Sequence, residues 1–169
     1  MLDKPSRTTP WRYYEFFVQQ NYNEFLNEEG SITRAFNACV PAFQLADVFY
    51  KYYQHHDRTK ISQWKTPKDL LIHLCALEPH FVTIQSVTFV YKHLYATKGH
   101  YDVGSPMSLN GILTKKIEIA ADWSNESGVP PRVTVRKRDQ TEAYIVDALR
   151  PVVEKMWPRF LPQESDEDW

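Results

Sequence analysis

The segment from Pro79 to about Tyr95 carries apolar side chains around most of the circumference of a helix. Its apolar members are Phe81, Ile84, Val87, Phe89, Val90, Leu94 and Tyr95. Because proline suits the first turn of a helix, Pro79 predicts where this helix begins. A helix that is apolar on every side must be surrounded by other elements. We therefore predict that this segment lies at the centre of a helical bundle.

Apolar residues that recur every three or four positions predict three more helices before the central one. The first begins at Trp11 and ends near Gly30, since glycine readily closes a helix. The second follows the capping residue Ser31, and the third begins at Pro67. Pro41 lies inside the second helix and removes one backbone donor there, so we expect a kink at that point.

The pattern after the central helix changes from helical to alternating. The stretches "KKIEIAADW" and "RVTVRKR" alternate apolar and polar residues, which is typical of half-buried strands. We predict that they form an antiparallel hairpin over about residues 113–138. A last helix, capped by Asp139 or Thr141, should then run to Phe160 with a bend at Pro151.

These patterns together predict the fold class and the domain organisation. The fold class is mainly α, a bundle of four to five helices with a β-hairpin inserted before the C-terminal helix. The chain of 169 residues suits one domain, predicted over residues 11–161. Residues 1–10 are expected to form a flexible lead-in, and residues 162–169 an acidic tail.

Composition excludes several broad classes of protein. Lys and Arg number 20 against 21 Asp and Glu, so a surface that binds nucleic acid everywhere is not expected, although a local basic patch is compatible with this charge. No apolar run approaches the roughly 18 residues of a membrane span, and no secretory signal is evident. We expect a cytoplasmic protein without membrane contact, in which Cys39 and Cys75 are reduced core thiols.

The sequence offers one pair of residues for acid–base chemistry. No Gly-rich phosphate loop, G-x-S-x-G, C-x-x-C or H-E-x-x-H motif is present, and we expect no cofactor and no metal. Lys92 and His93 adjoin near the end of the central helix, so only one of them can point inward. If His93 does, Asp47 on the second helix is the best partner, and an Asp–His pair would prepare a general base. The alternative interpretation is a structural polar pair at a helix end.

The segments "FNACVPAFQLADVFYKYY" and "IQSVTFVYKHL", in the order of elements described, resemble the HEPN superfamily of small helical-bundle proteins in prokaryotic defence and toxin systems. The resemblance covers residues 11–97. Active members are RNases with an Arg, four to six residues, then His motif on the last core helix, usually assembled across a dimer. The resemblance places His93 at the histidine position and Asp47 at the upstream polar position.

The arginine position of that motif departs from the family pattern. It would fall on Ser86, Val87 or Thr88, and none of these can hold a scissile phosphate as a guanidinium does. Lys92 offers only a point charge in another direction. The resemblance therefore implies a non-catalytic binding or regulatory protein, bacterial and homodimeric, that contacts RNA or a partner protein. The alternative is a metal-independent RNase centred on His93, with Asp47 as its orienting acid and Lys92 near phosphate.

A third interpretation is a metal-binding helical-bundle hydrolase. The stretch "HHDR" ends the second helix, and its two histidines could join others between helices. Those candidates are His55, His56, His73, His80 and His93. The Glu-x-x-His repeat of such sites is missing, so cations at a helix C-terminus are the preferred interpretation.

The predicted hairpin is rich in basic residues. Its candidate nucleic-acid contacts are Lys115, Lys116, Arg132, Arg136 and Arg138. Basic side chains near aromatic ones can hold a phosphate backbone and stack a base. However, alternate residues of "RVTVRKR" share one face of a strand, so the arginines also fit an ordinary solvated face. The aromatic run "WRYYEFF" similarly fits either the core or a dimer surface.

Overall fold

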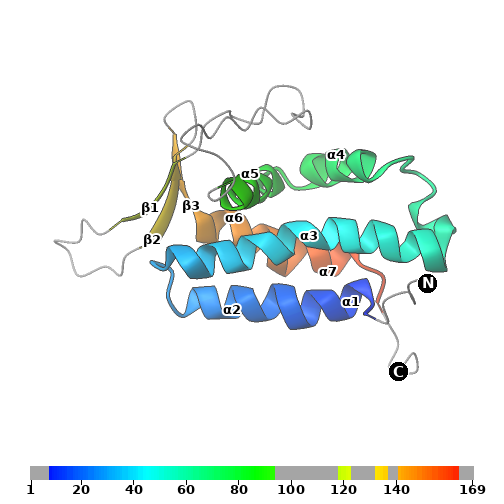
Figure 1. The fold of residues 1–169 in the computed structure, drawn as a ribbon, viewed down its shortest axis with the longest axis horizontal. Coiled ribbons are helices and arrows are strands. Elements are labelled where there is room, and N and C mark those ends of the chain that lie inside the picture. Colours follow the sequence, from blue (N-terminus) through cyan, green and yellow to red (C-terminus); the bar gives the residue numbers. More distant parts are fainter. Residues whose placement is uncertain (1–7, 94–117, 123–131, 137–140, 164–169) are drawn as a thin grey trace.

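Helices stack in layers around the long helix α3 (Figure 1). The computed structural model describes residues 8–93, 118–122, 132–136 and 141–163. Helix α3, Ile32–His56, lies between the N-terminal helix on one side and α5, His80–His93, on the other. The C-terminal helix packs against α3 and α5, and a small sheet lies at one end of the bundle. The predicted fold class, a mainly helical bundle with a hairpin before the last helix, is confirmed.

The N-terminal helix is continuous but changes its winding. It consists of α1 (Pro10–Tyr13), a π-helical stretch (Tyr14–Gln19) and α2 (Gln20–Leu26). The Thr9 hydroxyl accepts a hydrogen bond from the backbone of Arg12, which satisfies one of the unpaired amides at the helix start. Tyr14, Val18, Tyr22 and Phe25 form its buried face, which packs on α3, whereas Phe17, an apolar residue of the predicted pattern, is exposed.

Helix α3 runs uninterrupted through Pro41. Ser31 caps it, as predicted, by accepting from the backbone N–H of Arg34 at 3.3 Å. A short 3-10 turn, Arg58–Ile61, follows its end. The next helix, α4 (Pro67–Leu77), begins with a capping box between Thr66 and Asp69. Its start at Pro67 is the one predicted from the sequence.

Helix α5 is the central helix that the sequence predicts. Every side chain from Thr83 to Thr88 is buried, including the polar ones. The hydroxyls of Ser86 and Thr88 donate to carbonyls of their own helix, Val82 and Ile84, at 2.9 Å each. The Gln85 amide has no hydrogen-bond partner among the described residues. The central place of α5 in the bundle therefore buries its polar side chains as well as its apolar ones.

The sheet contains the predicted hairpin and one further strand. Strands β1 (Glu118–Asp122) and β2 (Arg132–Arg136) pair antiparallel, and β3 (Glu142–Tyr144) pairs with the other edge of β2. Val133 and Val135 of β2 face the core, and the backbone N–H of Val133 donates to the carbonyl of Glu29 at 2.8 Å. The sheet is thereby tied to the turn between α2 and α3.

The start of the last helix is a correction to the sequence analysis. Asp139 lies outside the described residues, and Thr141 precedes a strand rather than a helix. The helix begins at Ile145, and Tyr144 caps it without a side-chain hydrogen bond. The physical reason is that the free edge of β2 has backbone groups to pair, and residues 142–144 pair with them before the helix can start.

The C-terminal helix contains a second π-helical stretch, which lies against the first. It consists of α6 (Ile145–Pro151), the π-helical Val152–Met156 and α7 (Trp157–Phe160). The carbonyl of Val153 cannot accept from the residue five positions later, because Pro158 has no N–H. The buried hydroxyl of Tyr14 donates to this carbonyl at 2.8 Å. Burial raises the pKa of Tyr14, so the hydroxyl keeps its proton for this bond.

The contact between the two π-helical stretches can be tested by removing one oxygen atom. Tyr14→Phe leaves the buried Val153 carbonyl without its donor, and we expect the free energy of unfolding to fall by about 1–3 kcal/mol. Urea denaturation followed by circular dichroism measures the loss. The control is Tyr13→Phe, whose hydroxyl makes a longer bond of 3.3 Å to Gln44 in a partly exposed place. We expect a change below about 0.5 kcal/mol there; equal losses in both variants would contradict this role of Tyr14.

Candidate functional site

Asp47 lies on the exposed side of α3 and not on its buried side. Its side chain is 53% exposed, and its Oδ2 accepts from the Lys51 ammonium at 2.6 Å. Polar residues at this spacing, Asn37, Gln44, Asp47 and Lys51, form one stripe along the helix. The inward acid that we expected is therefore an exposed member of an ion pair. The spacing of these polar residues is the sequence signal that could have predicted an exposed Asp47.

The proposed pairing of Asp47 with His93 stays a prediction. The backbone of α5 extends to His93, and α5 packs along α3. The side chains of Lys92 and His93 lie outside the described residues. Their helices pack against each other, and of the proposed pair only the Asp47 side chain is described.

The hairpin arginines that the structure describes are paired with carboxylates. Arg132 Nε lies 3.3 Å from Glu29 Oε2, and its guanidinium stands over the ring of Tyr144 at 5.1 Å. Arg136 Nη2 lies 2.7 Å from Glu142 Oε1 on the neighbouring strand. Lys115, Lys116 and Arg138 lie outside the described residues. The two described arginines therefore favour the solvated-face interpretation over a free basic surface.

The described histidines are dispersed over separate contacts. His56 stacks on Tyr52, with ring centroids 4.1 Å apart and planes 8° from parallel. His73 packs against Trp64, and His80 Nδ1 lies 2.6 Å from Glu78 Oε1. Within residues 8–93 and the other described ranges, no three His, Cys, Asp or Glu residues are placed to hold a metal ion.

The two cysteines are free thiols with their charged form disfavoured. Cys39 is fully buried and Cys75 is partly buried. Burial raises the pKa of the Cys39 thiol far above its usual value and that of Cys75 to about 11. Because the thiolate is the nucleophilic form, neither sulfur is activated at neutral pH.

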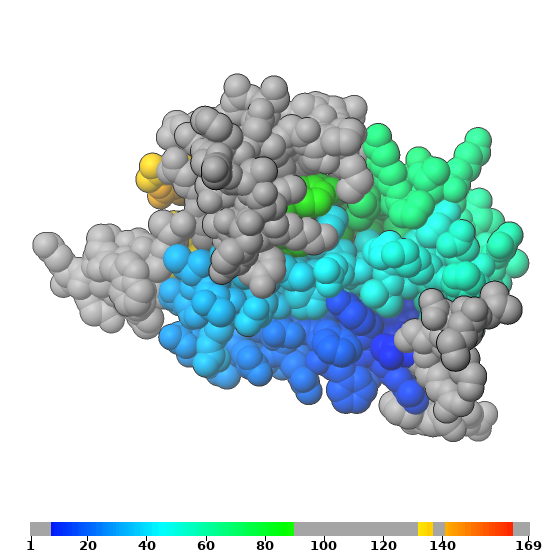
Figure 2. Space-filling view, viewed as in Figure 1, coloured from blue at the N-terminus to red at the C-terminus, as the bar shows by residue number. Residues whose placement is uncertain are grey.

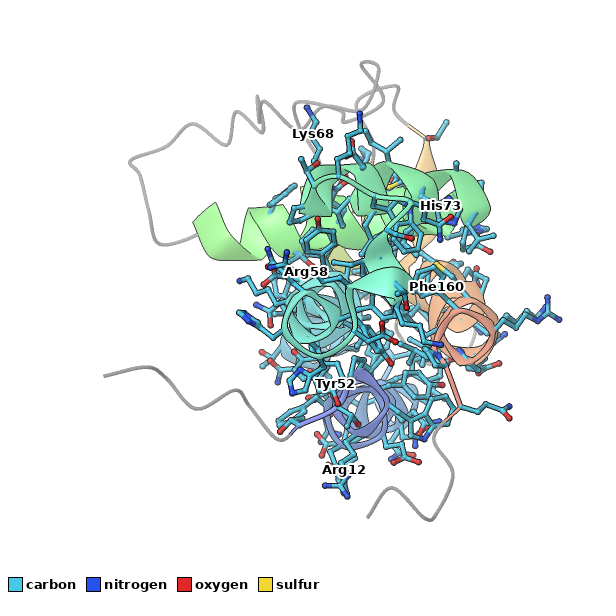
Figure 3. All side chains as sticks on the ribbon, turned by 90° about the vertical axis from the view of Figure 1, so that its right-hand side faces the viewer. Arg12, Tyr52, Arg58, Lys68, His73 and Phe160 are labelled. Atoms are coloured by element: carbon cyan, nitrogen blue, oxygen red, sulfur yellow. The ribbon has the colours of Figure 1, made fainter. Side chains whose placement is uncertain are left out.

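The end of the bundle where α3 gives way to α4 gathers exposed cations that the sequence analysis did not single out. We call the four residues Arg58, Lys60, Lys65 and Lys68 the basic end; all four are exposed. Figure 2 shows the last turns of α3 and the start of α4 forming the right-hand end of that face. Figure 3 looks onto this end and shows Lys68, Arg58 and Tyr52 in succession from top to bottom.

The loop that carries the basic end is held in place from beneath. The hydroxyl of Tyr50 on α3 lies within hydrogen-bond distance of two loop carbonyls, those of Trp64 (3.3 Å) and Lys65 (3.0 Å). The buried Trp64 ring packs against Phe49 and Phe160 at centroid distances of 6.3 and 5.8 Å. An anchored loop presents its cations without a large ordering cost on binding.

The acids next to the basic end are engaged in capping backbone amides. Asp57 Oδ1 accepts from the Thr59 backbone at 3.1 Å, and Asp69 Oδ2 accepts from the Thr66 backbone at 2.9 Å. No carboxylate among the described residues forms an ion pair with any member of the basic end. The Arg58 Nε instead donates to the Gln54 carbonyl at 3.1 Å. This end of the molecule thus gathers positive charge that forms no ion pair among the described residues, although the Asp57 carboxylate interacts electrostatically with Lys60.

Comparisons with known proteins add no relative. No family model matches this chain, and no curated protein or solved structure matches it significantly. Within the described residues, none of the helices has the length and apolar character needed to cross a membrane.

The cap at Asp57 predicts a pH response of the basic end. Hydrogen bonds from Thr59, and then the charge of Lys60, lower the pKa of Asp57. A carboxyl whose pKa is lowered by folding stabilises the turn above its unfolded pKa, and this contribution is lost as pH falls through the folded pKa. In an NMR titration we expect the Asp57 carboxyl carbon to titrate below the ordinary aspartate pKa, together with the Thr59 amide. Thr59→Ala should move this midpoint back upward, and an ordinary midpoint in the unaltered protein would refute the cap.

Proposed function

We propose that this chain is a non-catalytic, HEPN-like binding protein that contacts single-stranded RNA through its basic end. The observation that carries the proposal is the set of four exposed cations between the end of α3 and the first turn of α4, where the connecting segment is anchored and the neighbouring carboxylates Asp57 and Asp69 are engaged as caps. The molecule has a net charge of −1, so such a cluster is a local feature and not a consequence of a basic composition.

The chemistry of the basic end suits a phosphate backbone. Lysine and arginine side chains that neutralise phosphates release condensed counterions, which makes binding favourable at low salt. Tyr52 and His56, in the last two turns of α3, form a stacked pair on which a base can stack. Stacking of this kind requires unpaired bases, so a single strand is a better ligand than a duplex.

Homodimerisation, which the family resemblance implies, stays a prediction. Phe16 and Phe17 on the N-terminal helix are the support for it, since their side chains are 52% and 48% exposed. The ring of Phe17 lies 4.9 Å from that of Tyr13, which makes a local aromatic surface. Aromatic side chains at this exposure are common in protein contacts.

The RNA proposal predicts a loss of affinity when the lysines are neutralised. In a variant with Lys60→Gln, Lys65→Gln and Lys68→Gln, we expect the affinity for a labelled single-stranded oligoribonucleotide to fall at least about 10-fold at low salt. The slope of log affinity against log salt should decrease by about 2, because each phosphate contact on a single strand contributes about 0.7. Fluorescence anisotropy over a series of salt concentrations measures both quantities.

The matched control removes three positive charges from other parts of the surface. It combines Arg132→Gln, Arg136→Gln and Lys155→Gln, and we expect its affinity to change by less than about 3-fold. Circular dichroism confirms that both variants are folded. A larger loss of affinity in the control than in the lysine variant would indicate that RNA contacts the hairpin and not the basic end. Absence of binding by the unaltered protein would refute the proposal.

A metal-independent RNase centred on His93 is the second candidate. The observation that favours it is the packing of α5 along α3, which brings the helices of His93 and Asp47 together. The non-catalytic proposal expects labelled RNA to stay intact on incubation with the protein in a metal chelator. Cleavage under those conditions that falls about 100-fold or more in His93→Ala would establish the enzyme instead. Cleavage that stops in the chelator would indicate the metal-dependent alternative.

A further inference from the structure

Two of the six histidines of the chain directly precede the basic end. His55 and His56 are the last two residues of α3, three and two positions before Arg58, and both are exposed. Histidine is the side chain that gains a positive charge between about pH 8 and pH 5. We propose that protonation of His55 and His56 strengthens RNA binding, so that the basic end binds more tightly as pH falls. This regulation rests on the proposed function, because it acts through the same surface.

The two added protons change the local charge by a large fraction. Residues 55–69 contain the four cations of the basic end and the carboxylates of Asp57 and Asp69, so their formal charge is +2 with neutral histidines. Protonation of His55 and His56 raises this charge to +4. Affinity for a polyanion increases with the number of cations that can neutralise phosphates. A doubled local charge should therefore strengthen RNA binding measurably.

His56 can gain a proton without leaving its place. Its Nδ1 lies 2.8 Å from the carbonyl oxygen of Tyr52, which can only accept, so Nδ1 carries a hydrogen and Nε2 takes up the added proton. The His56 ring stacks on that of Tyr52 with centroids 4.1 Å apart, and the face of an aromatic ring also accommodates a cation. The stacking surface proposed for a base thus persists in both charge states and becomes cationic at low pH.

His55 extends the exposed polar stripe of α3 toward Arg58. Residues four positions apart lie on one face of a helix, which places His55 in line with Lys51 and Asp47. The Asp47 carboxylate is already bonded to the Lys51 ammonium at 2.6 Å, about two turns away from His55. His55 forms no ion pair within the described ranges. A proton on His55 therefore adds to the positive field of Arg58.

The elements packed on this end of α3 bring few carboxylates to offset the added charge. These elements are the 3-10 turn, α4 and α1. Together with the connecting residues, they carry the charged side chains of Arg12, Asp57, Arg58, Lys60, Lys65, Lys68 and Asp69. Both acids accept hydrogen bonds from backbone amides. Hydrogen bonds from Thr59 lower the pKa of Asp57, so this carboxylate stays ionised where histidines titrate.

The other described histidines lie apart from this surface and provide the control. His80 Nδ1 is 2.6 Å from Glu78 Oε1, so its charge has a carboxylate beside it. His73 lies beside the rings of Trp64 and Phe160. Figure 3 shows His73 and Phe160 on the opposite flank of this end from Arg58. Protonation of His73 and His80 should therefore add little to RNA binding.

Fluorescence anisotropy at about pH 7.5 and about pH 5.5 tests the pH response across the histidine range. The probe is a short oligouridylate without terminal phosphates, because a phosphate monoester itself titrates near about pH 6. It carries a dye that is insensitive to pH. For the unaltered protein at low salt, we expect at least about 5-fold tighter binding at the lower pH. The slope of log affinity against log salt should increase by about 0.7 for each histidine that contacts a phosphate.

Matched variants assign the response to particular histidines. The test variant combines His55→Gln with His56→Phe, which removes both titrating groups and keeps an aromatic ring for stacking on Tyr52. Its affinity should change by less than about 2-fold between the two pH values. The control combines His73→Gln with His80→Gln and should keep the full response. Circular dichroism at both pH values confirms that the variants are folded, and an undiminished response in the test variant would overturn the proposal.

Histidine NMR of the unaltered protein gives a readout that needs no substitution. If RNA binds the protonated form more tightly, RNA must raise the titration midpoints of the histidines that it contacts. We expect the midpoints of His55 and His56 to rise by about 0.3 pH units or more, and those of His73 and His80 by less than about 0.1. Equal shifts at all four histidines, or no shift at His55 and His56, would contradict the assignment.

The regulation and the proposed function fail in different ways. RNA binding that depends on the lysines but is not strengthened at the lower pH would overturn the regulation and leave the proposed function standing. Absence of RNA binding at both pH values would refute the proposed function and the regulation together.

Discussion

Three aromatic rings from three helices meet at the centre of the bundle. Phe81 of α5 lies 5.8 Å from Phe43 of α3 and 5.9 Å from Trp157 of α7, and both Phe81 and Trp157 are fully buried. The indole N–H of Trp157 donates to the Ala42 carbonyl at 3.0 Å, so the C-terminal helix is joined to α3 by a hydrogen bond as well as by packing. A large-to-small change at such a site typically costs about 3–5 kcal/mol. This contact holds α5 at the centre and sets the position of the other helices.

The central place of α5 determines where binding can occur. Because α3 packs on neighbours along most of its length, only one stripe of polar residues reaches solvent, and Asp47 belongs to that stripe. The end of α3 differs, since the chain must leave the helix there and return to α4 through an exposed turn. The charged residues of that turn are held by Tyr50 and Trp64 beneath them. The same fold that buries the core thus presents a cationic loop at one end.

Local signals in the sequence predicted those parts of the fold that depend on neighbours in the chain. The cap at Ser31, the helix start at Pro67 and the β1–β2 hairpin follow from backbone chemistry over a few residues. Strand β3 was missed because its pairing depends on the free edge of β2, which no local pattern reveals. The π-helical stretches were also missed. The bend expected at Pro151 takes the form of a wider turn, in which Tyr14 supplies the hydrogen bond that the backbone lacks.

The candidate site was harder to predict than the fold, for a physical reason. Whether a cationic residue is available to an anionic ligand depends on which carboxylates lie near it in the folded protein. Arg132 seemed a candidate from the sequence, but Glu29, about a hundred positions away, pairs with it. The lysines near Thr66 form no ion pair among the described residues, and the neighbouring Asp57 and Asp69 cap the backbone. Capping patterns are visible in a sequence, so a search for cations beside capping acids would have found the basic end.

The central claim, that an anchored cationic loop binds a single-stranded polyanion, is tested most directly by mapping the contact residue by residue. An NMR titration of the isotope-labelled protein with a short single-stranded oligoribonucleotide provides this map. The account predicts that amide shifts concentrate in residues 52–69. Shifts that concentrate in strand β2, or that are absent at saturating oligonucleotide, would contradict it.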